Sequence, residues 1–241
     1  FMITKNEIKR IKNLRKKKDR KELKLFVAEG EKTVLDLLNA GWQTENLYTL
    51  SSLEALEAFE ATQISEKDMS RLTFLKSAST ALGVFIIPEQ QAVSYQGRIL
   101  VLDGITDPGN LGTIIRIAAW FGIATIVCSL NTVDCYNPKV VQATMGSLAN
   151  MNCVYTDLVS FLNNTDKPIY AASMEGSSVY ETPLDQDGIL IMGSESQGIS
   201  KPLQVLAQNH ITIPRFGSEK AAESLNVAVA AAIILGQAFR P

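Results

Sequence analysis

From residue 98 onward, short apolar runs alternate with segments of helical pattern, and this alternation constrains the fold more than any other feature. Strands that alternate with helices form a largely parallel sheet covered on both faces. Ligands bind such sheets in the loops at the carboxyl ends of the strands. The sequence therefore predicts an α/β domain with its chemistry in those loops, and the expected strands are 98–102, 124–128, 153–154, 169–172, 189–192 and 211–213.

The preceding part of the chain has the pattern of a smaller α/β unit. Helices are predicted over 5–24, 32–39, 53–60 and 66–72, and strands over 26–30, 46–50, 63–64 and 84–87. The polar segment 88–97 contains Pro88 and Gly97 and lacks apolar periodicity, which is typical of a linker. We therefore expect two domains, residues 1–95 and residues 96–241.

Charge is distributed very unevenly along the chain. Eleven of the 23 basic residues lie between Lys5 and Lys24 against three acidic ones, so this segment carries +8 and the remainder −10 within a net charge of −2. A concentrated basic stretch indicates contact with a polyanion through its phosphates, although a solvated basic helix explains the charge equally well. The candidate RNA contacts are Lys12, Arg15, Lys16, Lys17, Lys18 and Arg20.

Composition excludes several other classes of protein. Three cysteines, Cys128, Cys135 and Cys153, have neither an even count nor the short paired spacing of a disulfide framework or a zinc cluster. The single histidine, His210, lies in a strand-like run where a structural role is commoner than a catalytic one. No apolar run is as long as a membrane span, and the basic N-terminus lacks the apolar core of a signal peptide. We therefore expect a cytoplasmic protein without a metal.

The segment 102–116 runs from a strand end through a Pro-Gly turn into a helix. Asn110 is placed to cap that helix or to reach a ligand. Arg116 stands among Ile114, Ile115 and Trp120 on a helix that is too apolar to lie on the surface. A guanidinium there requires an anionic ligand or partner, and the alternative is a structural ion pair.

Two later segments also carry polar groups next to apolar elements. The buried-looking strand 189–192 runs into a loop bounded by Gly193 and Gly198, whose backbone a ligand can approach closely. Glu195 in this loop is placed to bind a ligand or to orient a cation such as Arg116, and the alternative is a solvated carboxylate. In the last segment Ser224 is a candidate cap of the final helix, whereas Asn226 requires hydrogen-bond partners if it is buried.

These three segments resemble the SpoU, or TrmH-like, branch of the SPOUT superfamily of RNA methyltransferases, which methylate ribose 2′-hydroxyls. The matching pieces are Asn110-x-Gly112-x-x-x-Arg116, Gly193-Ser194-Glu195-x-x-Gly198 and the helix start Ser224-Leu225-Asn226-Val227-Ala228-Val229-Ala230. Their order and spacing match as well. Residues 5–95 resemble, more loosely, the N-terminal substrate-binding domain of longer members, through 26–32 and 82–84. Residues 215–223 make the third segment longer than in many members.

The resemblance implies a SPOUT α/β domain with a deep trefoil knot, a homodimer with the active site near the subunit interface, and S-adenosylmethionine as the cofactor. It implies ribosomal RNA as the substrate more than transfer RNA. The implied cofactor contacts are Met192, Gly193, Gly198, Ile213 and Leu225. The implied catalytic or substrate-facing residues are Asn110, Arg116, Glu195, Ser224 and Asn226.

The family's motif arginine has been assigned proton abstraction, but a guanidinium stays protonated at ordinary pH and is a poor base. We expect Arg116 to hold an RNA phosphate and to stabilise charge on the 2′-oxygen, with Asn110 and Glu195 fixing its geometry. Three alternatives remain: a transfer RNA methyltransferase, a non-catalytic RNA-binding protein that kept the fold, and a nucleotide-dependent oxidoreductase. The last lacks its Gly-x-Gly-x-x-Gly turn, because Gly104, Gly109 and Gly112 are spaced differently.

Overall fold

A computed structural model describes residues 3–51, 53–217 and 224–240. By packing, these residues form two compact units: unit 1 comprises Phe1–Glu89 and Asp134–Asn150, and unit 2 comprises Gln90–Val133 and Met151–Pro241. The sequence-based division placed 134–150 in the C-terminal domain, whereas this segment packs in unit 1. In the described part of the chain, every helix is too short or too polar to cross a membrane.

Unit 1 is built on a four-stranded sheet with the order β1-β4-β2-β3. Strand β4 is antiparallel to β1 and β2, and β3 is parallel to β2. Its elements are α1 (Lys5–Asn13), α2 (Lys17–Leu23), β1 (Leu25–Glu29), α3 (Glu31–Asn39), β2 (Thr44–Thr49), the 3-10 helix η1 (Glu54–Phe59), β3 (Thr62–Gln63), α4 (Glu66–Leu72), β4 (Ala81–Ile86), α6 (Pro138–Thr144) and the 3-10 helix η2 (Ser147–Asn150).

Two of the helix predictions for this unit need correction. The basic segment 5–24 is not one helix, because α1 ends at Asn13 and α2 starts at Lys17, with a turn between them. The turn lets Leu14 and Arg20 both enter the core, with exposed fractions of 1% each. The helix predicted over 53–60 is a single 3-10 segment, η1.

Unit 2 contains a six-stranded sheet in which every neighbouring pair is parallel, as the βα alternation predicted, with the order β10-β8-β9-β5-β6-β7. The strands are β5 (Ile99–Asp103), β6 (Thr125–Cys128), β7 (Asn152–Tyr155), β8 (Ile169–Ser178), β9 (Ile189–Gly193) and β10 (Asn209–Thr212). The helices are α5 (Pro108–Trp120), α7 (Leu158–Asn163), α8 (Lys201–Leu206) and α9 (Val227–Ala238).

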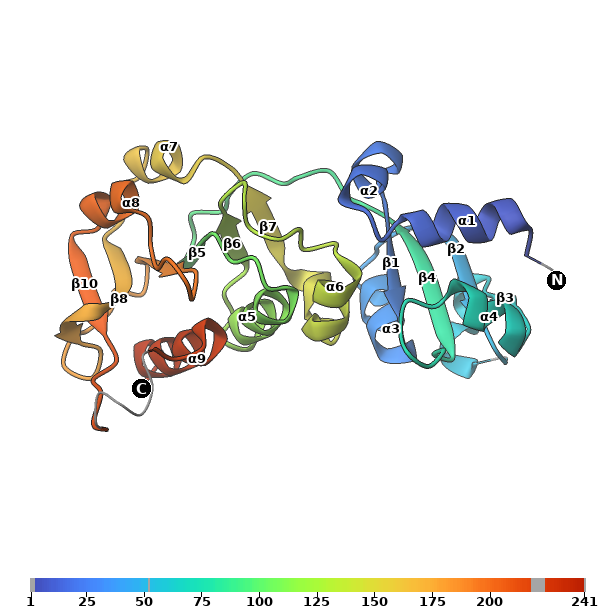
Figure 1. The fold of residues 1–241 in the computed structure, drawn as a ribbon. Coiled ribbons are helices and arrows are strands. Elements are labelled where there is room, and N and C mark those ends of the chain that lie inside the picture. The colour runs from blue at the N-terminus through green and yellow to red at the C-terminus, as the bar shows by residue number, and fades with distance from the viewer. Residues whose placement is uncertain (1–2, 52, 218–223, 241) are drawn as a thin grey trace. The chain divides into compact units, whose positions relative to one another are not determined.

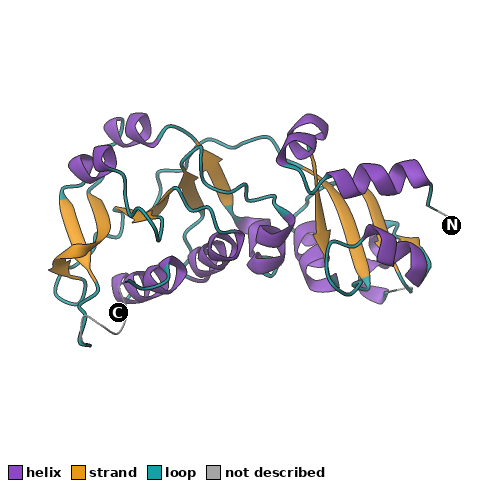
Figure 2. Cartoon of the chain, viewed as in Figure 1, coloured by secondary structure: helices purple, strands orange, loops and turns teal. Residues whose placement is uncertain are grey.

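Helices cover both faces of this sheet (Figures 1 and 2). On one face α7 and α8 pack on Ile99, Val101 and Ile191, which alternate along their strands. On the other face α5 packs against α9. Strand β5 is central. The next two strands in the chain, β6 and β7, lie on one side of it, and the later strand β9 pairs with its other side. The strand order therefore reverses between β5 and β9, which is the point where open parallel sheets bind ligands.

Candidate active site

The loops after β5 and β9 leave the sheet side by side, because these strands pair in register from Ile99–Ile189 to Asp103–Gly193. A hydrogen bond also ties the two loops together, since the backbone N–H of Ser200 donates to Asp103 Oδ2 at 2.8 Å. The sequence motifs that begin at Asn110 and at Gly193 therefore meet at one edge of the sheet.

Three predicted site residues form one hydrogen-bonded cluster at this edge, which we call the amide–carboxylate cluster: Asn110, Glu195 and Asn226. Glu195 Oε1 accepts from Asn110 Nδ2 at 3.1 Å and from Asn226 Nδ2 at 2.7 Å. Asn226 Nδ2 also donates to Asn110 Oδ1 at 2.9 Å. The cluster faces solvent, since Glu195 and Asn226 are exposed and Asn110 is half-buried. Residues from three distant segments thus share one polar site that a ligand can reach.

Local capping explains why Asn110 is available to this cluster. Asp107 is the N-cap of α5, and its Oδ1 accepts from the backbone N–H of Asn110 at 2.8 Å. Pro108 follows at the first helical position, where its missing N–H costs nothing. Asp107 was not among the predicted residues, although an aspartate directly before Pro-Gly at a helix start is a capping signal. The side chain of Asn110 is thereby left for Glu195.

The final helix is capped by Asn226, so the expectation that Ser224 caps it is wrong. Asn226 Oδ1 accepts from the backbone N–H groups of Ala228 at 3.0 Å and Val229 at 3.2 Å. Because the amide oxygen faces the helix, the amide nitrogen must face Glu195 and Asn110. Glu195 Oε1 also accepts from the backbone N–H of Val227 at 3.2 Å. One side chain thus starts α9 and completes the cluster.

A tight glycine turn places Glu195. A Cβ added at Gly193 would lie 2.1 Å from the carbonyl carbon of Gly198, so no other residue fits there without moving the backbone. Gly198 has φ +67°, and its N–H donates to the carbonyl of Ser194 at 2.8 Å. The two glycines therefore close the loop that presents Glu195 to solvent.

Arg116 is exposed, whereas the sequence predicted that it would be buried. It lies on α5, and within the described residues its guanidinium makes no hydrogen bond or ion pair. The buried stripe of α5 consists of Leu111, Ile114, Ile115 and Ala118, which leaves Arg116 facing outward. Asn110 and Arg116 are six residues apart, about 120° around a helix, so they point in different directions. The expectation that Asn110 and Glu195 hold Arg116 is wrong for a single chain.

The remaining cofactor candidates lie at the ends of neighbouring elements. Met192 is buried in β9, Ile213 is half-buried directly after β10, and Leu225 is 46% exposed before α9. Ser224 is exposed. Residues 218–223 of the lengthened third segment lie outside the described residues. Wherever the structure describes side chains, no group of three or more His, Cys, Asp or Glu residues is placed to hold a metal ion.

The predicted RNA contacts in unit 1 divide into two kinds. Lys16, Lys17 and Lys18 are exposed, whereas Lys12 and Arg15 pack over the ring of Phe74, at 5.3 and 4.8 Å from its centroid. Burial lowers the pKa of Lys12, and the neighbouring Arg15 lowers it further. Both side chains nevertheless remain close to the surface.

Arg20 does not belong to this set. It is 1% exposed, and its Nη2 forms an ion pair with Asp134 Oδ2 at 2.7 Å. A guanidinium enclosed in this way cannot reach a phosphate, so its assignment as an RNA contact is wrong. Sequence reasoning also missed Asp134, because nothing along the chain links it to a basic residue 114 positions away.

Two family models match successive parts of the chain. The model of the SpoU rRNA methylase family matches residues 97–236, and that of the MRM3-like substrate binding domain matches residues 5–83. The 23S rRNA (guanosine(2553)-2′-O)-methyltransferase RlmP of Bacillus subtilis is 29% identical over 237 residues, covering 95% of this chain and 94% of RlmP.

Two solved structures are similar over nearly the whole chain. A structure from Porphyromonas gingivalis, assigned to the TrmH family of RNA methyltransferases, is 33% identical with a TM-score of 0.89, covering 99% of this chain and 98% of that one. An AdoMet-bound rRNA methyltransferase from Sinorhizobium meliloti is 29% identical with a TM-score of 0.85, covering 98% and 95%. Because the methylase model alone matches more than half of the residues, the chain belongs to the SpoU rRNA methylase family.

Proposed function

We propose that this chain transfers a methyl group from S-adenosylmethionine to a ribose 2′-hydroxyl of ribosomal RNA. The observation that carries the proposal is the amide–carboxylate cluster, in which the three family motifs meet at the strand-order reversal of a parallel sheet. The similarity to RlmP over the length of both chains favours ribosomal RNA over transfer RNA.

The residues of unit 2 fit S-adenosylmethionine, which is bound in the S. meliloti relative. Small-molecule sites combine apolar surface with a few polar groups, often from the backbone. Gly193 and Gly198 provide backbone without side chains, while Ile213 and Leu225 offer partly exposed apolar side chains. Met192, Gly193, Gly198, Ile213 and Leu225 would hold the cofactor, which supplies an electrophilic methyl group when bound.

Glu195 is the residue best placed to act on the ribose hydroxyl. Its Oε1 already accepts three hydrogen bonds, from the side chains of Asn110 and Asn226 and from the backbone of Val227. Its Oε2 makes no hydrogen bond to the described residues and can accept the hydroxyl proton of the substrate. Asn110 and Asn226 then act by fixing the carboxylate before the substrate arrives.

Arg116 takes the role of an RNA clamp in this proposal. Its exposed guanidinium is free to bind a phosphate in bidentate fashion, and because it points away from Glu195 of its own chain, it would stabilise charge near a reacting oxygen in the partner's site. Arg116→Lys keeps the charge but loses the planar fork, so we expect partial methyl transfer with a raised KM for RNA. Arg240→Lys, an exposed arginine at the end of the chain, is the matched control. Full activity of Arg116→Lys would reject the clamp.

Unit 1 would deliver the RNA, as the match to a substrate binding domain suggests. Its exposed Lys16, Lys17 and Lys18 supply positive charge for phosphates, with Lys12 and Arg15 next to them. The domain boundary between residues 95 and 96 remains part of this proposal. Phosphate contacts of this kind make binding sensitive to salt but not to sequence.

A homodimer is also part of the proposal. Helices α5 and α9 pack together, and each leaves large apolar side chains exposed, Trp120 at 86% and Val229 at 49%. A second copy that covers this surface would bring a partner's groups toward Arg116, in line with an active site near the subunit interface. Sedimentation of the protein and of Trp120→Glu tests this, because the charged variant should be monomeric. The proposal also includes a trefoil knot in the methylase domain. It places the protein in the cytoplasm, where the ribosomal substrate is made.

The decisive experiment maps 2′-O-methyl groups in ribosomal and transfer RNA from cells with and without this protein. Loss of one ribosomal site, restored by the wild-type chain but not by Glu195→Gln, is the expected result. Loss of a transfer RNA site instead would favour that alternative substrate. Calorimetry with S-adenosylmethionine tests the non-catalytic alternative, which absence of binding at millimolar cofactor would favour.

A further inference from the structure

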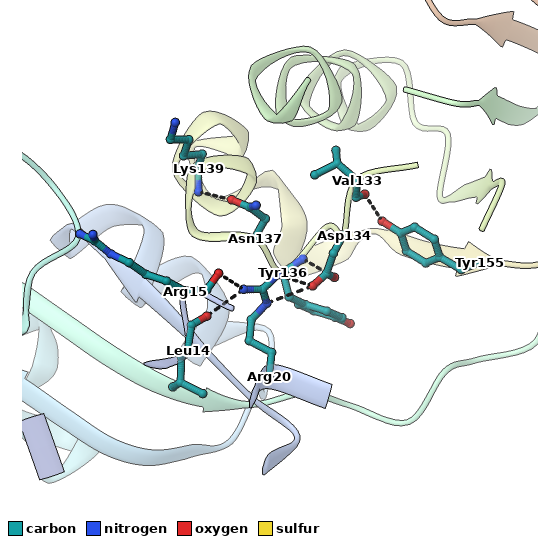
Figure 3. Close-up of polar contacts among 9 residues, drawn as sticks. All are labelled: Leu14, Arg15, Arg20, Val133, Asp134, Tyr136, Asn137, Lys139 and Tyr155. Atoms are coloured by element: carbon teal, nitrogen blue, oxygen red, sulfur yellow. Dashed lines mark hydrogen bonds and ion pairs between the residues drawn. The ribbon is translucent and has the colours of Figure 1, made fainter. Parts of the chain in front are cut away.

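The buried arginine of unit 1 organises the turn that carries the exposed basic residues. Arg20 Nη1 donates to the carbonyl oxygens of Leu14 and Arg15, both at 2.8 Å (Figure 3). These carbonyls belong to the turn between α1 and α2, beyond the end of the first helix. Without Arg20 both carbonyls would lose this donor, and the buried carbonyl of Leu14 would be left without a hydrogen bond. The guanidinium therefore fixes the backbone of the turn.

On its other side the guanidinium is held by Asp134. Both Nε and Nη2 donate to Asp134 Oδ2, at 3.0 and 2.7 Å. Asp134 Oδ1 in turn accepts from the backbone N–H of Tyr136 at 3.1 Å, and the Tyr136 ring packs on Phe26, with ring centroids 5.0 Å apart. The carboxylate is thus fixed in the core of unit 1, and Arg20 connects that core to the turn.

The segment that supplies Asp134 belongs by sequence to the methylase match at 97–236, although it packs in unit 1. Helix α6 lies against β1, and the indole N–H of Trp42 donates to the carbonyl of Ala149 at 3.1 Å. Directly before Asp134, the carbonyl of Val133 accepts from Tyr155 Oη at 2.7 Å within unit 2. The methylase region therefore contributes a structural piece of the RNA-binding unit.

We propose that Arg20 and Asp134 form a positioning pair that presents the basic turn, residues 14–18, to RNA. The proposal rests on the proposed function of unit 1 as the RNA carrier. Arg15, Lys16, Lys17 and Lys18 are all exposed in or next to this turn, whereas Arg20 is enclosed beneath it. A turn that is already ordered loses less entropy on binding, so fixing it strengthens RNA binding without a direct contact.

Asp134→Asn in the full chain tests the pair, because it removes the charge and keeps the shape of the side chain. We expect the KM for ribosomal RNA to rise about fivefold to tenfold, with kcat and the affinity for S-adenosylmethionine unchanged. The slope of log affinity against log salt should also flatten by about 1 for each phosphate that the turn no longer binds. Glu45→Gln is the matched control, since it breaks the exposed Arg10–Glu45 pair of the same unit at 2.6 Å.

A double-mutant cycle separates positioning from general weakening of the fold. The second background replaces Lys16, Lys17 and Lys18 together with Gln, so that the turn has little charge left to present. If Arg20 and Asp134 act through the turn, Asp134→Asn should change the KM by less than about twofold in this background. An equal rise in both backgrounds would overturn the proposal, and so would an unchanged KM in the wild-type background.

Arg20→Lys provides a second route to the same answer. Lysine keeps a charge for Asp134 but lacks the planar fork with which Arg20 bonds to Asp134 on one side and to both carbonyls on the other. We expect faster amide hydrogen exchange at residues 14–18 and the same rise in KM. If both variants lose the fold of unit 1 by circular dichroism, the pair is a stability element and the positioning role is rejected. Should the wild-type chain itself fail to methylate ribosomal RNA, the proposed function fails instead.

Discussion

Two polar groups of this protein differ in nearly every respect except that each joins distant parts of the sequence. The Arg20–Asp134 pair is buried in unit 1, and its guanidinium is bonded on all sides by one carboxylate and two carbonyls. The amide–carboxylate cluster of unit 2 is open to solvent, and Glu195 keeps one oxygen without a partner in the described chain. The hydrogen-bonding groups of the pair are therefore occupied by the protein itself, whereas the cluster keeps an acceptor available for a ligand.

The difference indicates how each group is used. A buried charge must have its partners within the protein, because water cannot replace them, so such a pair is part of the architecture. The side chains of an exposed cluster can bond to water instead, so the stability of the protein does not require them to be held in one arrangement. When such a cluster is ordered nonetheless, by a helix cap and two close glycines, the order itself indicates a ligand. Removing the cation of the buried pair should therefore lower stability and leave kcat unchanged, whereas variants of the cluster should lower kcat.

The largest effect is expected from Arg20→Met. This variant leaves the largely enclosed Asp134 without its cation, which costs about 3–5 kcal/mol for a fully buried pair. The measurement is urea unfolding followed by fluorescence in a Trp120→Phe background, because the chain has two tryptophans and Trp42 then reports on unit 1 alone. The exposed-pair control Glu45→Gln should lose less than about 1 kcal/mol. A loss below about 1 kcal/mol for Arg20→Met would mean that the pair is not architectural.

The next effect is catalytic. Glu195→Gln keeps a carbonyl oxygen for the three donors around Oε1 and replaces the free Oε2 with an amide. We expect kcat for methyl transfer to fall about 100-fold, a cost of about 2.7 kcal/mol in the transition state. The free energy of unfolding should change by less than about 0.5 kcal/mol. Glu181→Gln, an exposed carboxylate elsewhere in unit 2, controls for the loss of charge, and near-normal turnover by Glu195→Gln would remove Glu195 from the mechanism.

Sequence patterns predicted that polar loops would meet at one edge of the sheet, because a parallel sheet brings its strand ends together, but they centred the expected site on Arg116. Apolar runs near residues 99–102 and 189–192 identified β5 and β9, and the polar groups that follow them meet as expected. The resemblance to the SpoU motifs added Asn226, which periodicity alone could not bring to the same edge. Its role as the cap of α9 was missed, because Ser224 is an equally good capping residue by type.

The buried pair could not have been predicted in the same way. Arg20 stands in a run of basic residues, and nothing in its neighbours distinguishes the one that turns inward. Its burial depends on Asp134, which comes from a segment that the sequence assigns to the other domain. Arg116 shows the opposite error, since an apolar setting along the chain suggested burial while the helix turned it outward. In both cases tertiary packing decides whether the arginine is buried, and the local sequence pattern does not indicate the outcome.

A smaller effect separates the two roles of Asn226. Asn226→Ala removes the N-cap of α9 and should cost about 1 kcal/mol, whereas Asn226→Ser keeps a capping oxygen and should cost less than half of that. Both variants lose the amide that donates to Glu195, so both should slow methyl transfer, by roughly tenfold. Urea unfolding and single-turnover assays measure the two effects. If Asn226→Ser restores activity as well as stability, the amide serves only as a cap.

The smallest effect is expected from a variant of Lys16, which lies four residues before Arg20. Lys16 carries the same charge but is exposed, so Lys16→Gln should leave the free energy of unfolding within about 0.5 kcal/mol of the wild-type value. RNA affinity should fall about threefold, and the slope of log affinity against log salt should decrease by about 1, as expected when one phosphate is no longer neutralised. Filter binding at several salt concentrations gives both numbers. An unchanged slope would mean that the basic turn does not face the RNA, and the contrast between Lys16 and Arg20 would then concern stability alone.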